Sequence, residues 1–398
     1  MTASTARPYP FNPPEREGLD PCFVKLREDE PVSRILLPHG GESWLVTRYA
    51  DARFVLSDRR FSRAMAVGPG IPRLSVEPGG AEHIMMKDPP EHTRLRRLAA
   101  SAFGPVPVRR ARPRVAELAD RLLTEMADHG PPCDLVAAFS GPLPLIAMCE
   151  VLGVPYEDRV RFRGWVRALV TAPERTAEEL EEVIDEFSEY VGELIEQRRA
   201  NPTDDMLGEL VRTRDEEDLL TEEELLTFVG TMLIAGQEGA ANQLSAIAYV
   251  LLTRPDLFDQ LRERPDLVPT AIEELLRHAT NGSSVSYARV CTEDVEVGGV
   301  RMARGDAVMV SLPSANRDPA VFTDPEHLDL TRSPNPHMAF SAGPHHCMGS
   351  PLARMELQEA VSALVRRFPG LRLAVPADDV PWRIGPLVRA PSALPVVW

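Results

Sequence analysis

The strongest constraint on the fold is a long apolar segment at residues 228–252. A helix that is apolar around nearly its whole circumference is stable only when other elements surround it. No apolar run in the chain reaches the ~20 residues that a membrane span requires. The segment therefore predicts a central helix over residues 221–252, buried inside a protein with no membrane-spanning part.

Helical periodicity continues on both sides of this segment, from Pro90 to about Arg367. Apolar residues spaced three and four apart predict further helices at residues 114–129, 176–200, 269–280 and 350–367. The helix at 176–200 would be strongly acidic. The chain is therefore expected to be mainly α.

The β structure is expected to be small. Two short strand-like runs flank Gly40 and Gly41, which predicts a hairpin over residues 33–47. Strands are expected at 285–300 and 306–312, a long functional loop at 62–90 and a proline-rich meander at 316–344. With 398 residues and no linker, repeat or composition break, residues 1–398 are predicted to form a single domain.

Charge and cysteine content exclude several classes of protein. The net charge of -16 argues against a general nucleic-acid binder, because phosphate backbones require a basic face. The first fifteen residues are polar and proline-rich without an apolar export signal, so a cytoplasmic protein is expected. The five cysteines are odd in number and widely spaced, which favours neither disulfides nor a zinc ribbon.

The sharpest local signal is residues 340–349, F-S-A-G-P-H-H-C-M-G, which lead directly into a helix. A cysteine just before a helix N-terminus is favoured as a thiolate, and a thiolate is a soft metal ligand. Phe340 would shield the sulfur of Cys347, and Gly349 would let the backbone approach a flat ligand. The alternatives are a buried apolar cysteine and a zinc site with His345 and His346, although adjacent ligands point apart.

Two further segments carry charge in a specific pattern. Glu274 and Arg277 stand at i, i+3 on one helix face, where a guanidinium can pair with a carboxylate. His92 and Arg96 stand at i, i+4 and form a natural anion clamp. Either pattern alone is as consistent with an ordinary solvated surface.

Together, these segments resemble the cytochromes P-450 of the soluble bacterial kind. The resemblance rests on F-x-x-G-x-H-x-C-x-G at 340–349 and E-x-x-R at 274–277. It implies the cytochrome P-450 fold, a triangular α-helical prism with a small β region, and heme b as cofactor. It also implies an oxidoreductase of the monooxygenase type, in which the cysteine ligand helps to split dioxygen.

The resemblance assigns roles residue by residue. Cys347 matches the iron ligand, and the positions that hold the heme propionates are matched by His92, Arg96, Arg289 and His345. A structural ion network near the cysteine loop is matched by Glu274, Arg277 and Arg332.

The central helix departs from the family pattern. Residues 235–240, A-G-Q-E-G-A, align with A-G-x-[DE]-T-[TS], in which the helix bends over the heme. Glu238 occupies the acid position, but Gly239 stands where a threonine usually helps to deliver protons. Gly236 and Gly239 would loosen the helix, and proton delivery would need ordered water, Glu238 or the substrate itself.

This departure, with residues 332–337 and 393–398, resembles phenol- and indole-coupling members of actinomycete secondary metabolism. The first functional hypothesis is therefore oxidative C–C coupling of aromatic substrates, such as flaviolins or tryptophan-containing cyclic dipeptides. The second is hydroxylation or epoxidation of a macrolide, terpenoid or peptide. A heme-binding sensor without turnover is the alternative from another class.

Substrate and partner contacts can be predicted only coarsely. The candidate substrate residues are Met65, Val67, Met85, Met86, Ile234, Ala235, Ser283, Ser284, Val285, Ser286, Ile384 and Leu387. The resemblance implies electrons from NAD(P)H through a ferredoxin reductase and a ferredoxin. A basic docking patch for that ferredoxin is expected at Arg94, Arg97, Arg354 and Arg366.

Overall fold

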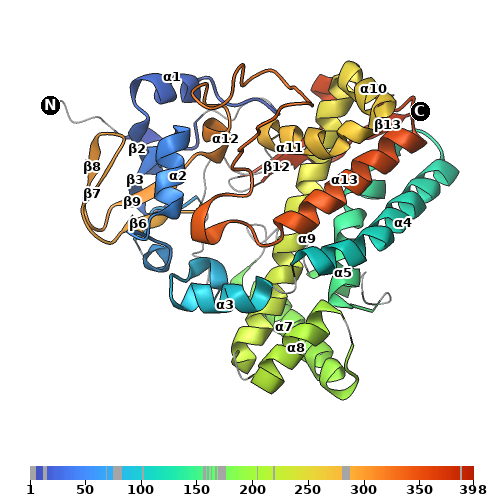
Figure 1. Ribbon diagram of the computed structural model, residues 1–398, viewed down its shortest axis with the longest axis horizontal. Helices are drawn as coiled ribbons and strands as arrows, with labels where there is room; N and C mark the ends of the chain where they lie inside the picture. The colour runs from blue at the N-terminus through green and yellow to red at the C-terminus, as the bar shows by residue number, and fades with distance from the viewer. Residues whose placement is uncertain are drawn as a thin grey trace.

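The computed structural model describes residues 6–11, 16–68, 70–74, 83–100, 103–155, 158, 161–162, 164–165, 168, 176–203, 205–217, 220–279, 287–385 and 388–398. Its helices are α1 (Cys22–Asp29), α2 (Tyr49–Ser57), α3 (Glu91–Ala100), α4 (Pro105–His129), α5 (Pro142–Leu152), α7 (Ala177–Ala200), α8 (Met206–Glu217), α9 (Glu222–Thr253), α10 (Pro255–Glu263), α11 (Val268–His278), α12 (Leu312–Ala315) and α13 (Ser350–Arg367). Most helices fill one side of the molecule, and the main sheet lies on the other beside α1 and α2 (Figure 1).

The central helix is α9, which runs through the middle of the helical side (Figure 1). A capping box starts it: Thr221 accepts from the backbone of Glu224, and the Glu224 carboxylate accepts from the backbone of Thr221. Residues 242–252 are all buried, with Ile247, Val250 and Leu251 at 0% exposure. The apolar segment thus forms the predicted central helix.

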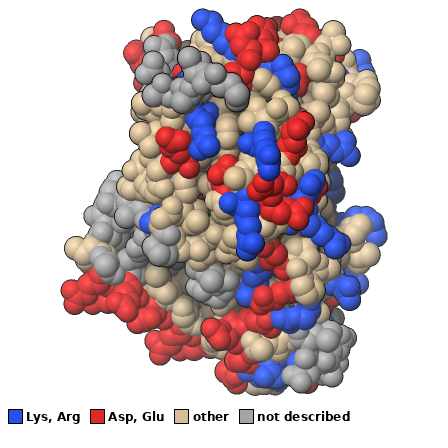
Figure 2. Space-filling view, turned by 90° about the vertical axis from the view of Figure 1, so that its left-hand side faces the viewer, with Lys and Arg blue, Asp and Glu red and all other residues tan. Residues whose placement is uncertain are grey.

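The surrounding helices bury the remaining faces of this core. α5 packs on α9, and α4 packs along α13, which in turn contacts α9 and α11. α7 and α8 cover the end of α9 that is lowest in Figure 1. Figure 2 shows acidic side chains gathered at that lower end, and α7 itself exposes a run of acids along its length, as predicted.

The strands form one main sheet and three small ones. The main sheet has the order β1-β2-β3-β9-β6-β4. Its strands are β1 (Arg7–Pro8), β2 (Val32–Leu37), β3 (Gly41–Val46), β4 (Phe61–Ser62), β6 (Arg289–Cys291) and β9 (Ala307–Val310). The pairing of Val32 with Val46 and of Leu37 with Gly41 confirms the predicted hairpin.

The small sheets join distant parts of the chain. They consist of β10 (Arg372–Leu373), β13 (Pro395–Val397) and β5 (Cys133–Asp134); β11 (Trp382–Ile384) and β12 (Arg389–Pro391); and β7 (Val295–Val297) and β8 (Val300–Met302). β13 brings the C-terminus beside β5, which leads into α5. The β11–β12 hairpin lies on α9, where it can affect the site described below.

Some predicted boundaries were wrong. α4 begins at Pro105 rather than residue 114, because proline is tolerated in the first turn of a helix. The strand expected at 285–300 is divided into β6 and β7, and β8 follows a turn in which Gly298 and Gly299 have positive φ. The predicted loop at 62–90 contains two 3-10 turns, Ala64–Ala66 and Ile84–Met86. No helix in the described part of the chain is long and apolar enough to cross a bilayer.

Candidate active site

Cys347 lies in the loop that enters α13. Its backbone N–H donates to the Phe340 carbonyl at 2.9 Å, which closes the loop. Gly343 has a φ of +69°, and a Cβ there would stand 2.3 Å from the Leu56 carbonyl, so this turn requires glycine. The Arg354 guanidinium lies 4.6 Å above the Phe340 ring. The loop is therefore packed against α2 at Gly343 and against Arg354 of α13 at Phe340.

The Cys347 side chain lies in a recess, exposed to solvent yet with protein around it on most sides. This burial raises the pKa of the thiol. The backbone N–H groups of Gly349 and Ser350 and the charges of Arg96 and Arg354 act in the opposite direction. The start of α13 thus supplies the donors that a thiolate requires.

Positive and N–H donor side chains gather beside this loop. The His92 and His345 rings lie 4.1 Å apart, and Arg96 donates to the His346 carbonyl at 2.5 Å. Burial, then Arg63, lowers the pKa of His345 to about 2. Burial also lowers the pKa of Arg289 to about 9, and nearby Arg63 acts in the same direction. We call His92, Arg96, Arg289, His345 and Arg63 the cationic cluster, after its three arginines; the lowered pKa values of the two histidines make them neutral ring N–H donors.

Two buried donor atoms of the cluster lack partners. Neither Nη1 of Arg289 nor Nδ1 of His92 has a hydrogen-bond partner among the described residues. Both side chains are only 2% exposed. Leaving a buried guanidinium or imidazole nitrogen without a partner is costly, and a bound anion would offer acceptors to both.

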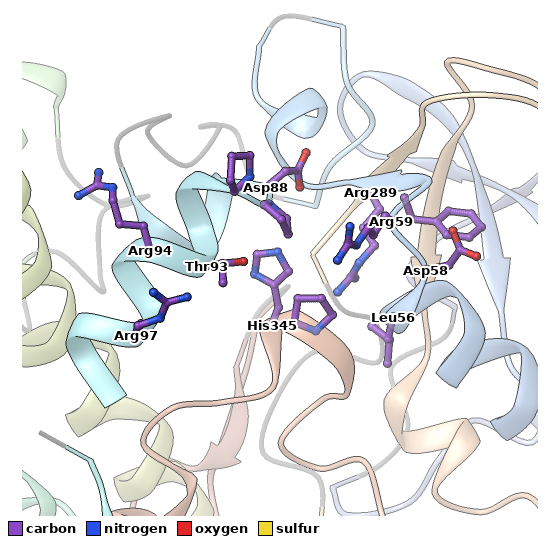
Figure 3. Close-up of a pocket in the computed structure, with 13 residues that line it drawn as sticks. Leu56, Asp58, Arg59, Asp88, Thr93, Arg94, Arg97, Arg289 and His345 are labelled. Carbon is purple, nitrogen blue, oxygen red and sulfur yellow. The ribbon is translucent and has the colours of Figure 1, made fainter. Parts of the chain in front are cut away.

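A cleft of about 440 Å³ opens onto one edge of the cluster. Arg94 and Arg97 from α3 lie on one side of it, Arg59 and Arg289 on the other, and His345 between them (Figure 3). Cys347 is not among the lining residues. The cleft is therefore an outer opening toward the cationic cluster that is not lined by the cysteine.

Comparisons with known proteins bear directly on this arrangement. The sequence model of the family "Cytochrome P450" matches residues 165–384. The chain is 48% identical over 399 residues to nocardicin C N-oxygenase of Nocardia uniformis subsp. tsuyamanensis, with 100% of both chains covered. The chain belongs to the cytochrome P450 family.

Two further proteins are similar over nearly the whole length of this P450. Mycinamicin IV hydroxylase/epoxidase of Micromonospora griseorubida is 44% identical over 400 residues, with 100% of each chain covered. The crystal structure of cytochrome P450mel 107F1, described as having biaryl coupling reactivity, has a TM-score of 0.93 at 44% identity and covers 99% of this chain and 100% of its own. The predicted P450 fold is thereby confirmed, as is the enzyme class, a P450 oxidoreductase of the monooxygenase type whose relatives act in secondary metabolism.

The residues present fit the heme that this family implies. Heme carries two propionates on one edge, and the unpartnered Arg289 and His92 donors are suited to carboxylates. Cys347 offers a sulfur surrounded by amide donors. Among the described residues, no group of three or more His, Cys, Asp or Glu gathers as a metal site, and the His345 ring packs on His92 instead.

Glu274, Arg277 and Arg332 come together in a buried ion network. The Arg277 guanidinium makes two bonds of 2.8 Å to Glu274, and Arg332 Nε lies 3.1 and 3.0 Å from the same two oxygens. Glu274 and Arg277 are 0% exposed. Asn335, which the sequence did not single out, donates a further bond of 3.1 Å to Glu274. The network joins α11 to the meander that leads to the cysteine loop.

α9 continues as an unbroken helix through the departure from the family pattern. A Cβ at Gly236 would stand 2.1 Å from the Met148 methyl group on α5, so the end of the Met148 side chain would have to move to accept one. Gly236 is thus a close packing position. A Cβ at Gly239 would meet nothing within 4 Å. Glu238 turns toward β11, where Arg383 Nη2 lies 3.3 Å from its carboxylate.

The predicted substrate residues have different surroundings. Met65 and Ile384 are exposed, at 42% and 51%, whereas Met86 is buried at 8%. Val67 and Met85 are half-buried. Outside the described residues are Ser283, Ser284, Val285, Ser286 and Leu387, together with the side chains of Ile234 and Ala235.

The expected basic docking patch is partly neutralised. Arg94 forms an ion pair with Glu224, and Arg366 pairs with Asp120 at 2.7 Å. Arg354 pairs with Glu273 at 2.9 Å. Arg97 lines the cleft.

Sequence reasoning missed Arg63 and Arg383. Arg63 is 5% exposed, donates its backbone N–H to Asp88 at 2.9 Å and its Nε to the Met85 carbonyl at 2.9 Å. No motif surrounds either arginine, and in a chain rich in arginine neither position stands out. Only the folding of the 62–90 loop and of the β11–β12 hairpin brings them to the site.

The Glu274 network gives a stability prediction. Glu274→Gln leaves two arginines without their counter-charge and should lower the free energy of unfolding by about 3–5 kcal/mol. Glu273→Gln, one residue earlier, should cost less, because the Glu273 side chain is 26% exposed and its partner Arg354 31%. Chemical denaturation of both variants measures the difference.

The sign of its pH dependence follows from the contacts. Burial opposes ionisation of Glu274, but its bonds to Arg277 and Arg332 outweigh burial and hold the pKa of the carboxyl below its usual range. The stabilisation is therefore present above the ordinary glutamate pKa and is lost as pH falls. The gap between wild type and Glu274→Gln should close in acid; a gap that widens in acid would contradict the network.

Proposed function

We propose that this P450 transfers an oxygen atom from dioxygen to a small natural product. The observation that carries the proposal is full-length similarity, at 48% and 44% identity, to an N-oxygenase and to a hydroxylase/epoxidase. Both names denote oxygen insertion. This proposal reverses the order of the two hypotheses drawn from the sequence alone.

In this proposal, Cys347 ligates the heme iron and the cationic cluster holds the propionates. Arg289 and His92 would donate through the atoms that now lack partners, and Arg96 would add charge from α3. Arg63 would join them as a member that the sequence did not single out. The heme, when bound, supplies the activation of dioxygen.

The chain's own part in proton movement centres on Glu238. Burial raises the pKa of this carboxyl, while Arg383 and the bond from Asn242 lower it. Gly239, the next residue, has no hydroxyl to pass a proton onward. Glu238, ordered water or a polar group of the substrate must then carry protons to the reacting oxygen.

Electrons are proposed to come from NAD(P)H through a ferredoxin reductase and a ferredoxin, in the cytoplasm. The docking surface would centre on Arg97 and the neighbouring cleft, because ion pairs neutralise the other predicted arginines. Attraction to an acidic ferredoxin should weaken as salt increases.

Oxidative coupling of two aromatic rings is the second candidate. Gly239 in the threonine position supports it, since coupling inserts no oxygen, as does similarity to a P450 with biaryl coupling reactivity. The substrates would be phenols or indoles, including cyclic dipeptides. A heme sensor without turnover would consume no substrate.

Turnover under isotope-labelled dioxygen tests these candidates. With a competent electron donor, a substrate that shifts the heme spectrum should yield a product containing one labelled oxygen atom. A dimeric product without label would favour coupling and contradict oxygen insertion. Failure to consume any spectrally binding substrate would favour the sensor.

Restoring the missing hydroxyl gives a separate prediction. The open space at Gly239 accepts a side chain, so Gly239→Thr should fold and bind heme. If protons now arrive by way of substrate or water, the threonine should change the product formed per NAD(P)H consumed by about tenfold, less than the roughly 10²–10⁴-fold that general acid–base catalysis contributes to rates.

Gly239→Val is the matched control, because valine has nearly the shape of threonine without its hydroxyl. Product yield per NAD(P)H should differ between the two variants. Equal yields would show that only bulk matters at this position.

A further inference from the structure

The β11–β12 hairpin is anchored along one face of α9. Trp382 packs edge-to-face on Tyr249, with ring centroids 5.1 Å apart. Trp382 is paired with Pro391, and Arg383 with Ala390, which is 0% exposed. The backbone of β11 is thus fixed beside α9 by an aromatic contact and by its partner strand.

Arg383 follows Trp382 and reaches α9 at two successive turns. Its Nη2 donates to the Asn242 amide oxygen at 2.9 Å and lies 3.3 Å from the Glu238 carboxylate. Glu238 and Asn242 are four residues apart, so their side chains share a face, and Tyr249 lies seven residues farther along the same face. The hairpin therefore contacts α9 through one apolar and one charged residue.

The contact with Arg383 orients the flexible side chain of Glu238, which occupies the acid position of the family motif. A glutamate has several rotatable bonds, and the Glu238 side chain is still 24% exposed. The charged and polar groups that meet it among the described residues are Arg383 from β11 and Asn242 from α9. Gly239, the next residue, has no hydroxyl that could also hold the Glu238 carboxylate. The orientation of this carboxylate therefore depends on its contacts with Arg383 and Asn242.

We propose that Arg383 is a positioning residue for Glu238: it ties the carboxylate to the β11–β12 hairpin and favours its ionised form. The proposal rests on the proposed function for its role in proton delivery. The positioning role itself does not depend on the reaction: the Arg383 guanidinium sets the orientation and charge state of the Glu238 carboxylate. A change in the hairpin, such as contact with substrate at the exposed Ile384, would then alter the orientation and charge state of Glu238.

The direct test is infrared titration of the Glu238 carboxyl in the heme-loaded protein. The band is identified by its loss in Glu238→Gln. Arg383→Gln keeps hydrogen-bond donors but removes the charge, so Glu238 should take up its proton at higher pH than in wild type. Arg383→Lys keeps the charge and should lie closer to wild type. Arg301→Gln, which breaks an exposed ion pair with Asp294, should leave the titration unchanged.

Turnover provides the second measurement. Arg383→Gln should lower product per NAD(P)H by about twofold to fivefold, the range that partly exposed ion pairs support. The pH profile of that yield should move in the same direction as the carboxyl titration, and Arg383→Lys should restore most of it. Heme content and thermal unfolding should match those of wild type in both variants.

Three results would overturn the proposal. They are an unchanged Glu238 titration in Arg383→Gln, an equal loss of yield in Arg383→Lys, and loss of heme in the lysine variant. The titration needs no substrate, so it is independent of the reaction type. A shifted titration in a protein that inserts no oxygen would sustain the positioning role while contradicting the proposed function.

Discussion

The interaction on which the site depends is the burial of positive charge beside Cys347. Arg289 and Arg63 are almost inaccessible to water, and burial lowers the pKa of both guanidinium groups, to about 9 and about 10. Their nearest acid, Asp88, is already bonded to Ser62 and to the backbone of Arg63. An anionic ligand would stabilise this arrangement, and in the proposed function the propionates of heme would supply it.

The rest of the fold positions this charge. α3 carries His92 and Arg96, β6 carries Arg289, and the loop before α13 carries His345. The Glu274 network joins α11 to the meander preceding that loop. The position of the cysteine therefore depends on buried ion pairs between residues that are distant from it in the sequence. Elsewhere, α9 presents Glu238 to the β11–β12 hairpin. The same fold thereby fixes the positions of the Cys347 sulfur and the Glu238 carboxylate.

The sequence predicted the parts that local pattern determines. α7, α9 and α13 were found nearly at their expected limits because their amphipathic or apolar periodicity is continuous. The cysteine loop and the Glu274 network were recognisable because their residues are close together or fall in family motifs. Arg63 and Arg383 were missed because their partners are brought to them by tertiary packing. The close approach of Met148 to Gly236 was not predicted, since Met148 lies on another helix.

The most direct test of the account is the spectrum of the reduced, CO-bound protein after Cys347→Ala. Cys133→Ala, which removes a half-buried cysteine on β5, serves as the control. The account predicts that the absorption band typical of thiolate-ligated heme is present in wild type and in the control and is absent in Cys347→Ala. Retention of that band without the Cys347 sulfur would contradict it.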